Sequence, residues 1–242
     1  MNLSQSVNIK IIFDSEAVSS EYKTGWGFSC FINNHILFDT GSDGQAILDN
    51  LGLMGNKIQQ IDKIIISHEH NDHAGGLWKI LESKKNLPVY ICPGFSPGFE
   101  SQITNLGSKP IESQEFQEID ENVFTTGEIK GLYRSFNIPE QSLIIRTSKG
   151  LIVITGCAHP GVIRILKVVK EHFPDDDFYL VLGGFHLVGM NRKEMEKVVS
   201  DFEALQIQKI APLHCSGELA KSTSGKLSKN FIRLLVGQQL DL

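Results

Sequence analysis

Residues 62–76 read DKIIISHEHNDHAGG, and this stretch decides the fold. It opens with Ile64–Ile66, a short apolar run between polar residues, which is typical of a buried β-strand. Two glycines, Gly75 and Gly76, then lead into a helix expected over 75–82. Between the strand and the helix lie four side chains that can bind a metal: His68, His70, Asp72 and His73.

The spacing of these four side chains predicts a metal site. In an extended segment alternate side chains point the same way, so His68 and His70 can converge on one ion. Asp72 and His73 lie past the bend and can turn toward a second ion. Imidazole and carboxylate are good ligands for zinc, iron and manganese. A histidine-rich surface loop is the alternative, but it does not explain this spacing directly after an apolar strand.

Two further strand ends carry the same kind of residue. Asp39 follows the strand expected at 36–38 and is read either as an Asx turn or as a buried carboxylate that orients a ligand histidine. Cys157 and His159 follow the strand expected at 151–155. Either of them alone could be a core or helix-start residue, but beside the first motif we expect at least one to bind a metal.

His214 and His186 complete the set. His214 follows the strand expected at 208–212 and is predicted to bind a metal. His186 follows the strand at 178–182 and is read either as a substrate or supporting contact or as a buried structural histidine. Gly183 and Gly184, between that strand and His186, leave room for a ligand or for another backbone segment. Sites in α/β folds collect at strand ends, so these residues are expected to share one edge.

The rest of the chain alternates strands with helices, which predicts an α/β fold in which helices cover a sheet. Other strands are expected at 7–13, 27–32, 89–92, 116–119, 123–125 and 142–147, and helices at 44–53, 162–172, 192–205 and 231–236. Asn33–Asn34 predicts a tight turn, because Asn tolerates positive φ. Proline and glycine in residues 93–130 predict an irregular segment that lines the substrate pocket.

Length and charge narrow the class of protein. The 242 residues fit a single domain over 1–242, and the net charge of −5 with a pI of about 5.9 disfavours nucleic acid as a partner. No apolar run is long enough to cross a bilayer, and the N-terminus lacks the order of a signal peptide. We therefore expect a cytoplasmic protein with a small-molecule substrate and no membrane partner. The oligomeric state is open.

The motifs together resemble the metallo-β-lactamase superfamily. The residues that carry the resemblance are Asp39-Thr40-Gly41, the HEHNDH run at 68–73 and the late His214. The strings TGCAHPG (155–161), GGFHL (183–187) and PLHCSG (212–217) resemble its dihydropterin synthase-like subgroup. The resemblance implies an αββα sandwich of two mixed sheets flanked by helices, with two divalent metal ions at one edge.

The resemblance also implies how the ligands are shared. The first ion would take His68, His70 and His159, and the second would take Asp72, His73 and His214. The sequence departs from the usual pattern where Cys157 stands in place of a bridging Asp and where no histidine precedes the late strands. Cys157 or His159 could replace the bridging ligand, and Glu140 could approach the first ion. Zinc is the favoured metal because of the thiolate, with iron and manganese as alternatives.

The implied function is that of a metal-dependent hydrolase, which uses a metal-bound hydroxide on an ester, lactone or phosphate-type substrate. Asp72 would orient that hydroxide and take its proton. The narrower resemblance indicates an alternative, a pterin-related transferase that releases pyrophosphate. A third class, a redox di-iron protein or metal-stabilised binding module, fits less well, since the di-iron relatives carry Glu where His70 stands. RNA processing usually needs a basic arm, and none is visible.

Overall fold

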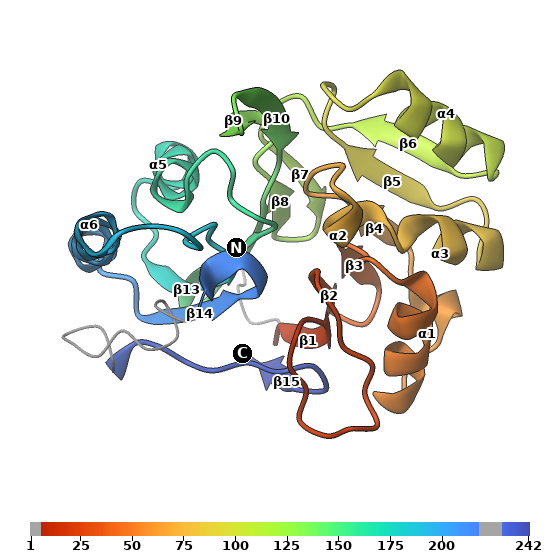
Figure 1. Cartoon of the computed structure of the whole chain (residues 1–242), viewed down its shortest axis with the longest axis horizontal. Coiled ribbons are helices and arrows are strands. Elements are labelled where there is room, and N and C mark those ends of the chain that lie inside the picture. The colour runs from red at the N-terminus through yellow and green to blue at the C-terminus, as the bar shows by residue number, and fades with distance from the viewer. Residues whose placement is uncertain (1–5, 218–228) are drawn as a thin grey trace. The chain divides into compact units, whose positions relative to one another are not determined.

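The computed structural model describes residues 6–217 and 229–242. The chain divides into two compact units, and each of them contains one of the two large sheets (Figure 1). We call Ser6–Gln114 with Leu234–Leu242 the N-terminal unit, and Glu115–Arg233 the C-terminal unit. Each unit is described by itself.

The N-terminal unit is built on a seven-stranded mixed sheet in the order β15-β1-β2-β3-β4-β5-β6. The strands are β1 (Asn8–Phe13), β2 (Ser29–Ile32), β3 (Ile36–Phe38), β4 (Lys63–Ile65), β5 (Pro88–Ile91), β6 (Lys109–Glu112) and β15 (Gln239–Asp241). β15, β1, β2 and β3 pair antiparallel, whereas β3, β4, β5 and β6 pair parallel. The turn between β2 and β3 has Asn33 and Asn34 at φ of 50° and 59°, which confirms the predicted asparagine turn.

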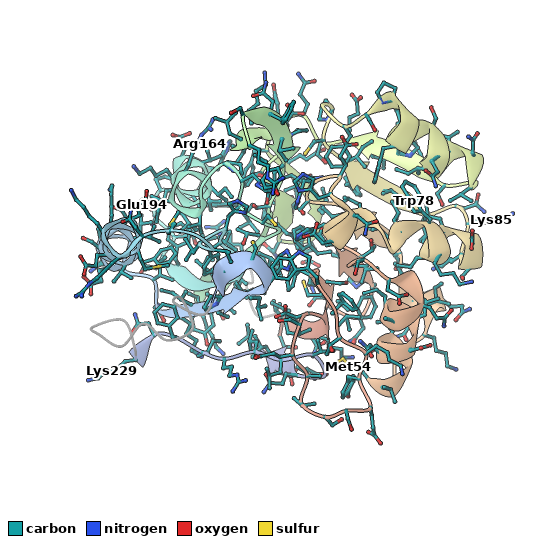
Figure 2. All side chains as sticks on the ribbon, viewed as in Figure 1. Met54, Trp78, Lys85, Arg164, Glu194 and Lys229 are labelled. Carbon is teal, nitrogen blue, oxygen red and sulfur yellow. The ribbon has the colours of Figure 1, made fainter. Side chains whose placement is uncertain are left out.

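Helices cover this sheet and fill its core (Figure 1). They are α1 (Gly44–Leu53), α2 (Asn71–Ala74), α3 (Leu77–Ser83) and α4 (Pro97–Asn105), with a 3₁₀ turn, η1 (Ile58–Gln60). The carboxylate of Asp43 caps α1 by accepting from the backbone N–H groups of Gln45 and Ala46. Met54, just past α1, and Trp78 on α3 pack against the buried side chains beneath them (Figure 2).

The C-terminal unit is built on a six-stranded mixed sheet in the order β14-β13-β12-β11-β8-β7, and a separate hairpin pairs β9 with β10. The strands are β7 (Gln117–Asp120), β8 (Val123–Thr125), β9 (Ile129–Tyr133), β10 (Phe136–Glu140), β11 (Leu143–Thr147), β12 (Gly150–Thr155), β13 (Phe178–Gly184) and β14 (Lys209–Leu213). β12, β13 and β14 run parallel, so their carboxyl ends meet at one edge of the sheet.

Two helices close the core of this unit, α5 (Val162–His172) and α6 (Arg192–Ala204), and a 3₁₀ turn, η2 (His214–Ser216), follows β14. The apolar side of α5 buries Val162, Ile165, Leu166 and Val169, which recur at helical spacing. Arg164 on α5 and Glu194 on α6 project to the outside (Figure 2). The predicted bounds of α5 match the structure, and those of α6 differ by one residue.

The structure corrects two predictions of local structure. Residues 93–130 are more regular than predicted, because α4 and β6 lie within them in addition to the two expected strands, β7 and β8. Their prolines occupy positions that tolerate proline: Pro97 is in the first turn of α4, and Pro110 is in β6, at the edge of its sheet. That this segment lines a pocket stays a prediction.

The second correction concerns residues 231–236, which are not helical. Phe231 bridges to Ile210, and Val236 bridges to Ala17, so this part of the chain runs extended toward β15. Six residues are too few to form a helix without a packed face, because the first turn costs more backbone entropy than its single hydrogen bond returns. Among the described residues, no helix is both long enough and apolar enough to cross a bilayer.

Candidate functional site

The first group of candidate ligands lies in the N-terminal unit, where two neighbouring parallel strands end. Asp39 directly follows β3. Ser67 and His68 follow β4 after Ile66. Because β3 and β4 are parallel, these residues emerge at the same edge of the sheet. His70 then precedes α2, and the short helix carries Asp72 and His73. The predicted delivery of these residues by strand ends is therefore confirmed within this unit.

Three of these side chains come together as possible metal ligands. His68, His70 and Asp72 each offer one ligand atom, and these atoms lie within 4.8 Å of one another. The imidazole rings of His68 and His70 have centroids 4.7 Å apart. The fourth side chain, His73, has its ring 4.3 Å from that of His68, and its Nε2 lies 3.9 Å from Asp72 Oδ2.

Asp39 is a buried carboxylate that forms hydrogen bonds with Ser67 and His73, next to this donor set. Asp39 Oδ1 accepts from the backbone N–H of Ser67 at 2.7 Å, and Asp39 Oδ2 accepts from Ser67 Oγ at 2.7 Å. The same Oδ2 lies 2.6 Å from His73 Nδ1. These partners are 28 and 34 residues away in sequence. The local Asx turn considered from sequence is thus replaced by a buried carboxylate that contacts residues distant in sequence, as a supporting residue of a metal site would.

The Asp39 contacts fix which ring nitrogen of His73 and of His68 bears a proton. An ionised carboxylate only accepts hydrogen bonds, so Nδ1 of His73 is the donor, and in the neutral imidazole its Nε2 keeps a lone pair. The Ser67 hydroxyl donates to Asp39, so Ser67 Oγ accepts from Nδ1 of His68 at 2.9 Å. His68 therefore also keeps a lone pair on Nε2, which is the form a metal ligand needs.

The surroundings of Asp39 are closed to water. Asp39, Ser67, His68 and His73 are all fully buried. Burial raises the pKa of the nearby Cys30 thiol well above its usual value, and the negative charge of Asp39 adds to the rise. A buried carboxylate with three directed contacts holds its partners in place far better than a solvated one.

The second group of candidate ligands lies in the C-terminal unit, on the turns after three adjacent parallel strands. Cys157 and His159 follow β12, His186 follows β13, and His214 follows β14. Because these strands are parallel neighbours, the turns gather at one edge of the sheet. His186 and His214 have backbone φ of 50° and 49°, so each side chain leaves its strand through a sharp turn.

Cys157, His186 and Cys215 form a donor set of their own, with ligand atoms within 4.8 Å of one another. The Sγ atoms of the two cysteines are 3.4 Å apart, and neither cysteine is in a disulfide. Gly184 makes room for this pair, since a Cβ there would lie 2.8 Å from Cys215 Sγ and 2.3 Å from the carbonyl oxygen of Gly156. Of the two roles considered for the paired glycines, the structure supports close approach of another backbone segment.

Glu140, considered from sequence as a ligand, has both carboxylate oxygens directed at the turn after β12. Oε1 accepts from the backbone N–H of Ala158 and Oε2 from that of His159, each at 2.7 Å. Ala158 lies in the left-handed region at φ 61°, and Glu140 is buried. Both oxygens are thus engaged in holding the turn that presents His159. The ring of His159 lies 4.6 Å from that of His186.

Sequence reasoning missed three residues of these groups. Ser67 precedes His68 directly, and a hydroxyl beside a buried ligand histidine was a signal that could have been used. Cys215 directly follows His214, and a thiol beside a predicted ligand was a second signal. Tyr133 lies on β9, which was not predicted, and its ring centroid is 5.4 Å from that of His159.

Two further histidines, His35 and His172, lie outside these groups. His35 Nδ1 lies 2.9 Å from the carbonyl oxygen of Asn33 in the β2–β3 turn. His172 stacks on Phe116 with ring centroids 4.0 Å apart. Neither histidine belongs to a donor set, so replacing either of them is a control for replacing a candidate ligand.

The residues present fit divalent metal ions. The N-terminal unit offers two imidazoles and a carboxylate, and the C-terminal unit offers an imidazole and two thiols. Imidazole, carboxylate and thiolate are the ligand types of zinc sites. The buried Asp39 and the Ser67 hydroxyl supply the supporting hydrogen bonds that metal-ligating histidines usually have.

The fold and these donor sets define an α/β protein with candidate metal ligands at its strand ends, and comparison with known sequences identifies the family. Residues 33–176 match the metallo-β-lactamase superfamily. The chain belongs to that superfamily, and its fold is the metallo-β-lactamase fold.

Particular relatives are similar over almost the whole chain. The 7,8-dihydropterin-6-methyl-4-(β-D-ribofuranosyl)-aminobenzene-5′-phosphate synthase of Methanocaldococcus jannaschii is 29% identical over 98% of both chains. A solved metal-dependent hydrolase of the β-lactamase superfamily is 26% identical, with a TM-score of 0.80 over 98% of this chain and 99% of the other. The short form of human tRNase Z shares the fold, with a TM-score of 0.60 and 15% identity over 96% and 98% of the two chains. The resemblance predicted from the motifs is confirmed.

Proposed function

We propose that this protein is a metal-dependent hydrolase with two divalent ions per chain, most suitably zinc, acting on a small molecule with an ester, lactone or phosphate-type bond. The observation that carries the proposal is the buried Asp39–Ser67 support, which leaves the Nε2 atoms of His68 and His73 ready to bind a metal. The 26% identical solved hydrolase, similar along its full length, gives the proposal further support.

The ligands follow from the motifs and the superfamily. His68, His70 and His159 would hold one ion, and Asp72, His73 and His214 would hold the other. Cys157 or His159 would supply the ligand that an Asp usually provides in the family. Divalent ions held there supply Lewis acidity and lower the pKa of a bound water. Glu140 acts on this site indirectly, by holding the N–H groups of Ala158 and His159.

Asp72 is the residue to which we assign the proton transfer. It is half-buried and the first acidic residue of α2, with Oδ2 3.9 Å from His73 Nε2. A carboxylate at that place can align an attacking water and take its proton. The proton would then pass to the leaving oxygen of the cleaved bond.

A single variant tests this assignment. Asp72→Ala should reduce hydrolysis by about 100-fold or more, the size of effect that general-base groups contribute, while the fold is kept. Zinc-loaded wild-type and variant proteins would be compared on a bis(p-nitrophenyl) phosphate and lactone panel, with metal content and circular dichroism measured on the same samples. Full activity in a variant that holds its metal would contradict the role of Asp72.

The archaeal synthase relative favours a second candidate, a pterin-related transferase. In such a reaction an aromatic carbon or amine attacks the methylene carbon of a pterin diphosphate ester. The carbon–oxygen bond breaks, pyrophosphate leaves, and the nucleophile loses a proton. Pyrophosphate release from a pterin-methyl diphosphate that occurs only when 4-aminobenzoate is present would select this candidate. Release without the amine would select hydrolysis.

A further inference from the structure

The β9–β10 hairpin of the C-terminal unit lies against the turn that carries His159. Its two strands are joined by Arg134 and Ser135, with φ of 47° and 72°, and Tyr133 pairs directly with Phe136. Glycine or asparagine usually occupies such a two-residue turn, because both positions need positive φ. This hairpin instead carries a charged side chain at its tip, together with two exposed apolar residues, Leu132 and Phe136.

The hairpin has two different faces, since side chains alternate along a strand and paired residues share a face. The pairs Ile129–Glu140, Gly131–Ile138 and Tyr133–Phe136 lie on one face, which we call the inner face. The pairs Lys130–Pro139 and Leu132–Asn137 lie on the opposite, outer face.

The inner face is the one that contacts the His159 turn. Glu140 accepts from the N–H groups of Ala158 and His159 at the base of the hairpin. One pair further on, a Cβ at Gly131 would lie 2.7 Å from the carbonyl carbon of His159, so the missing side chain lets the two backbones meet. The next pair along this face is Tyr133–Phe136.

Tyr133 and Phe136 therefore extend the inner face beyond the imidazoles. The ring centroid of Tyr133 lies 5.4 Å from that of His159 and 6.0 Å from that of His186, both edge-on. Tyr133 is half-buried, whereas Phe136 is 72% exposed. A lone exposed apolar residue needs no explanation. Phe136, however, is the cross-strand partner of a ring that contacts two candidate ligand imidazoles, and such a pair offers a surface for another ring.

A positive charge lies beside this pair. The Arg134 guanidinium carbon lies 5.2 Å from the centre of the Tyr133 ring, and Arg134 is exposed. The carboxylate of Glu140, on the same face, is buried and bonded to backbone N–H groups. An exposed cation beside an aromatic surface suits a ring that carries a negative group.

We infer that Tyr133 and Phe136 form a subsite for a planar aromatic ring with an anionic substituent, which Arg134 attracts. This inference rests on the proposed function in one respect. The ring is part of the substrate molecule, and the reacting bond of that molecule meets the donor residues. The two rings thereby determine which substrates bind, while the donor residues carry out the reaction.

Ring binding can be measured without turnover. The probes are pterin-6-carboxylic acid, a fluorescent planar ring with a carboxylate, and pterin itself, which lacks that group. The zinc-loaded full chain would be titrated in the wild type, in Tyr133→Leu with Phe136→Leu, and in Leu132→Ala. Leu132 is the matched control, because it is an exposed apolar residue on the outer face of the same hairpin.

We expect the carboxylated probe to bind the double variant about tenfold or more weakly, the size that aromatic contacts contribute, with Leu132→Ala unchanged. Tyr133→Phe should retain binding, and Arg134→Gln should remove the preference for the carboxylated probe. Metal content and circular dichroism should match the wild type throughout. No binding by the wild type, equal binding by the double variant, or an equal loss in Leu132→Ala would overturn the inference.

A further variant separates this inference from the proposed function. Asp72→Ala lies outside the hairpin and should still bind the probe as the wild type does. Probe binding that depends on Tyr133 and Phe136, in a protein without hydrolytic activity, would keep the subsite and reject the hydrolase. Hydrolysis that depends on Asp72, with a probe affinity indifferent to the two rings, would keep the hydrolase and reject the subsite.

Discussion

At the scale of single residues, the site depends on carboxylates that never need to touch a metal. Asp39 reaches His73 directly and reaches His68 through the Ser67 hydroxyl. Glu140 does the corresponding work in the C-terminal unit by holding two backbone N–H groups. In both cases a buried negative group fixes the geometry of a neighbouring histidine, and such support tunes metal sites as strongly as some ligands do.

Replacing Asp39 tests the support in the N-terminal unit. Asp39→Asn has a single acceptor oxygen, so it cannot serve Ser67 and His73 as the carboxylate does. We expect zinc affinity to fall about 10- to 100-fold while the fold is retained, as for other supporting residues of metal sites. Competition titration with a chromogenic chelator measures the affinity.

Two comparisons make the Asp39 result specific. Ser67→Ala removes only the link to His68, so its loss of affinity should be smaller than that of Asp39→Asn. Asp49→Asn changes an exposed carboxylate on α1 and should leave affinity unchanged. An Asp39→Asn protein that binds zinc like the wild type would show that the carboxylate does not prepare the histidines.

Replacing Glu140 tests the support in the C-terminal unit. In Glu140→Gln one of the two N–H groups, of Ala158 or His159, loses its acceptor in a buried place. We expect the free energy of unfolding to fall by about 1–3 kcal/mol, the penalty for a buried group left unpaired. Urea unfolding measures it, and Glu118→Gln is the control, because this exposed side chain accepts a single bond that the amide can keep. Equal effects of the two variants would argue against the support.

At the scale of elements, the sequence predicted what local pattern determines. Apolar spacing was sufficient for α1 and α5, and turn chemistry was sufficient for Asn33–Asn34. The local pattern failed at β6, where Pro110 contributed to the prediction of an irregular segment. β6 is an edge strand with a neighbour on one side only, so it tolerates proline. The partner of β6 is β5, which precedes α4 in the chain, so a local pattern does not contain that pairing.

The same limit applies to the candidate site. Histidines directly after apolar strands could be identified, because the strand signal and the ligand signal are adjacent in sequence. The pairing of Glu140 with the Ala158–His159 turn and the contact of Tyr133 with His159 both depend on the β9–β10 hairpin. The hairpin was not predicted, so neither contact could be foreseen.

The edge strand β15 offers a test at this scale. It pairs with β1, and Val7 and Leu242 exchange two backbone hydrogen bonds of 2.9 Å. Deleting residues 239–242 should lower the midpoint of urea unfolding, since each lost bond contributes about 0.5–1.5 kcal/mol, and should promote aggregation through the exposed edge of β1. Gln239→Ala keeps the backbone pairs and should behave as the wild type. A truncated protein as stable and monodisperse as the full chain would show that β15 adds nothing.

At the scale of the whole molecule, both units place their candidate ligands in the same way. Parallel strands end at one edge, and histidines, cysteines or carboxylates stand on the turns that follow them. One half supplies two imidazoles and a carboxylate, and the other supplies an imidazole and two thiols. The superfamily and the donor chemistry are the grounds of the proposal that the protein holds metal ions for a reaction on a small molecule.

The most direct test of this account is the metal content per chain of gently purified protein. It would be measured by inductively coupled plasma mass spectrometry for the wild type and for His70→Ala, Cys157→Ala and His159→Ala, with His35→Ala as a histidine outside the donor sets. We predict two divalent ions in the wild type and in His35→Ala, fewer in His70→Ala, and fewer in at least one of Cys157→Ala and His159→Ala. One ion or none in the wild type, unchanged in both variants of the turn after β12, would contradict the two-metal centre.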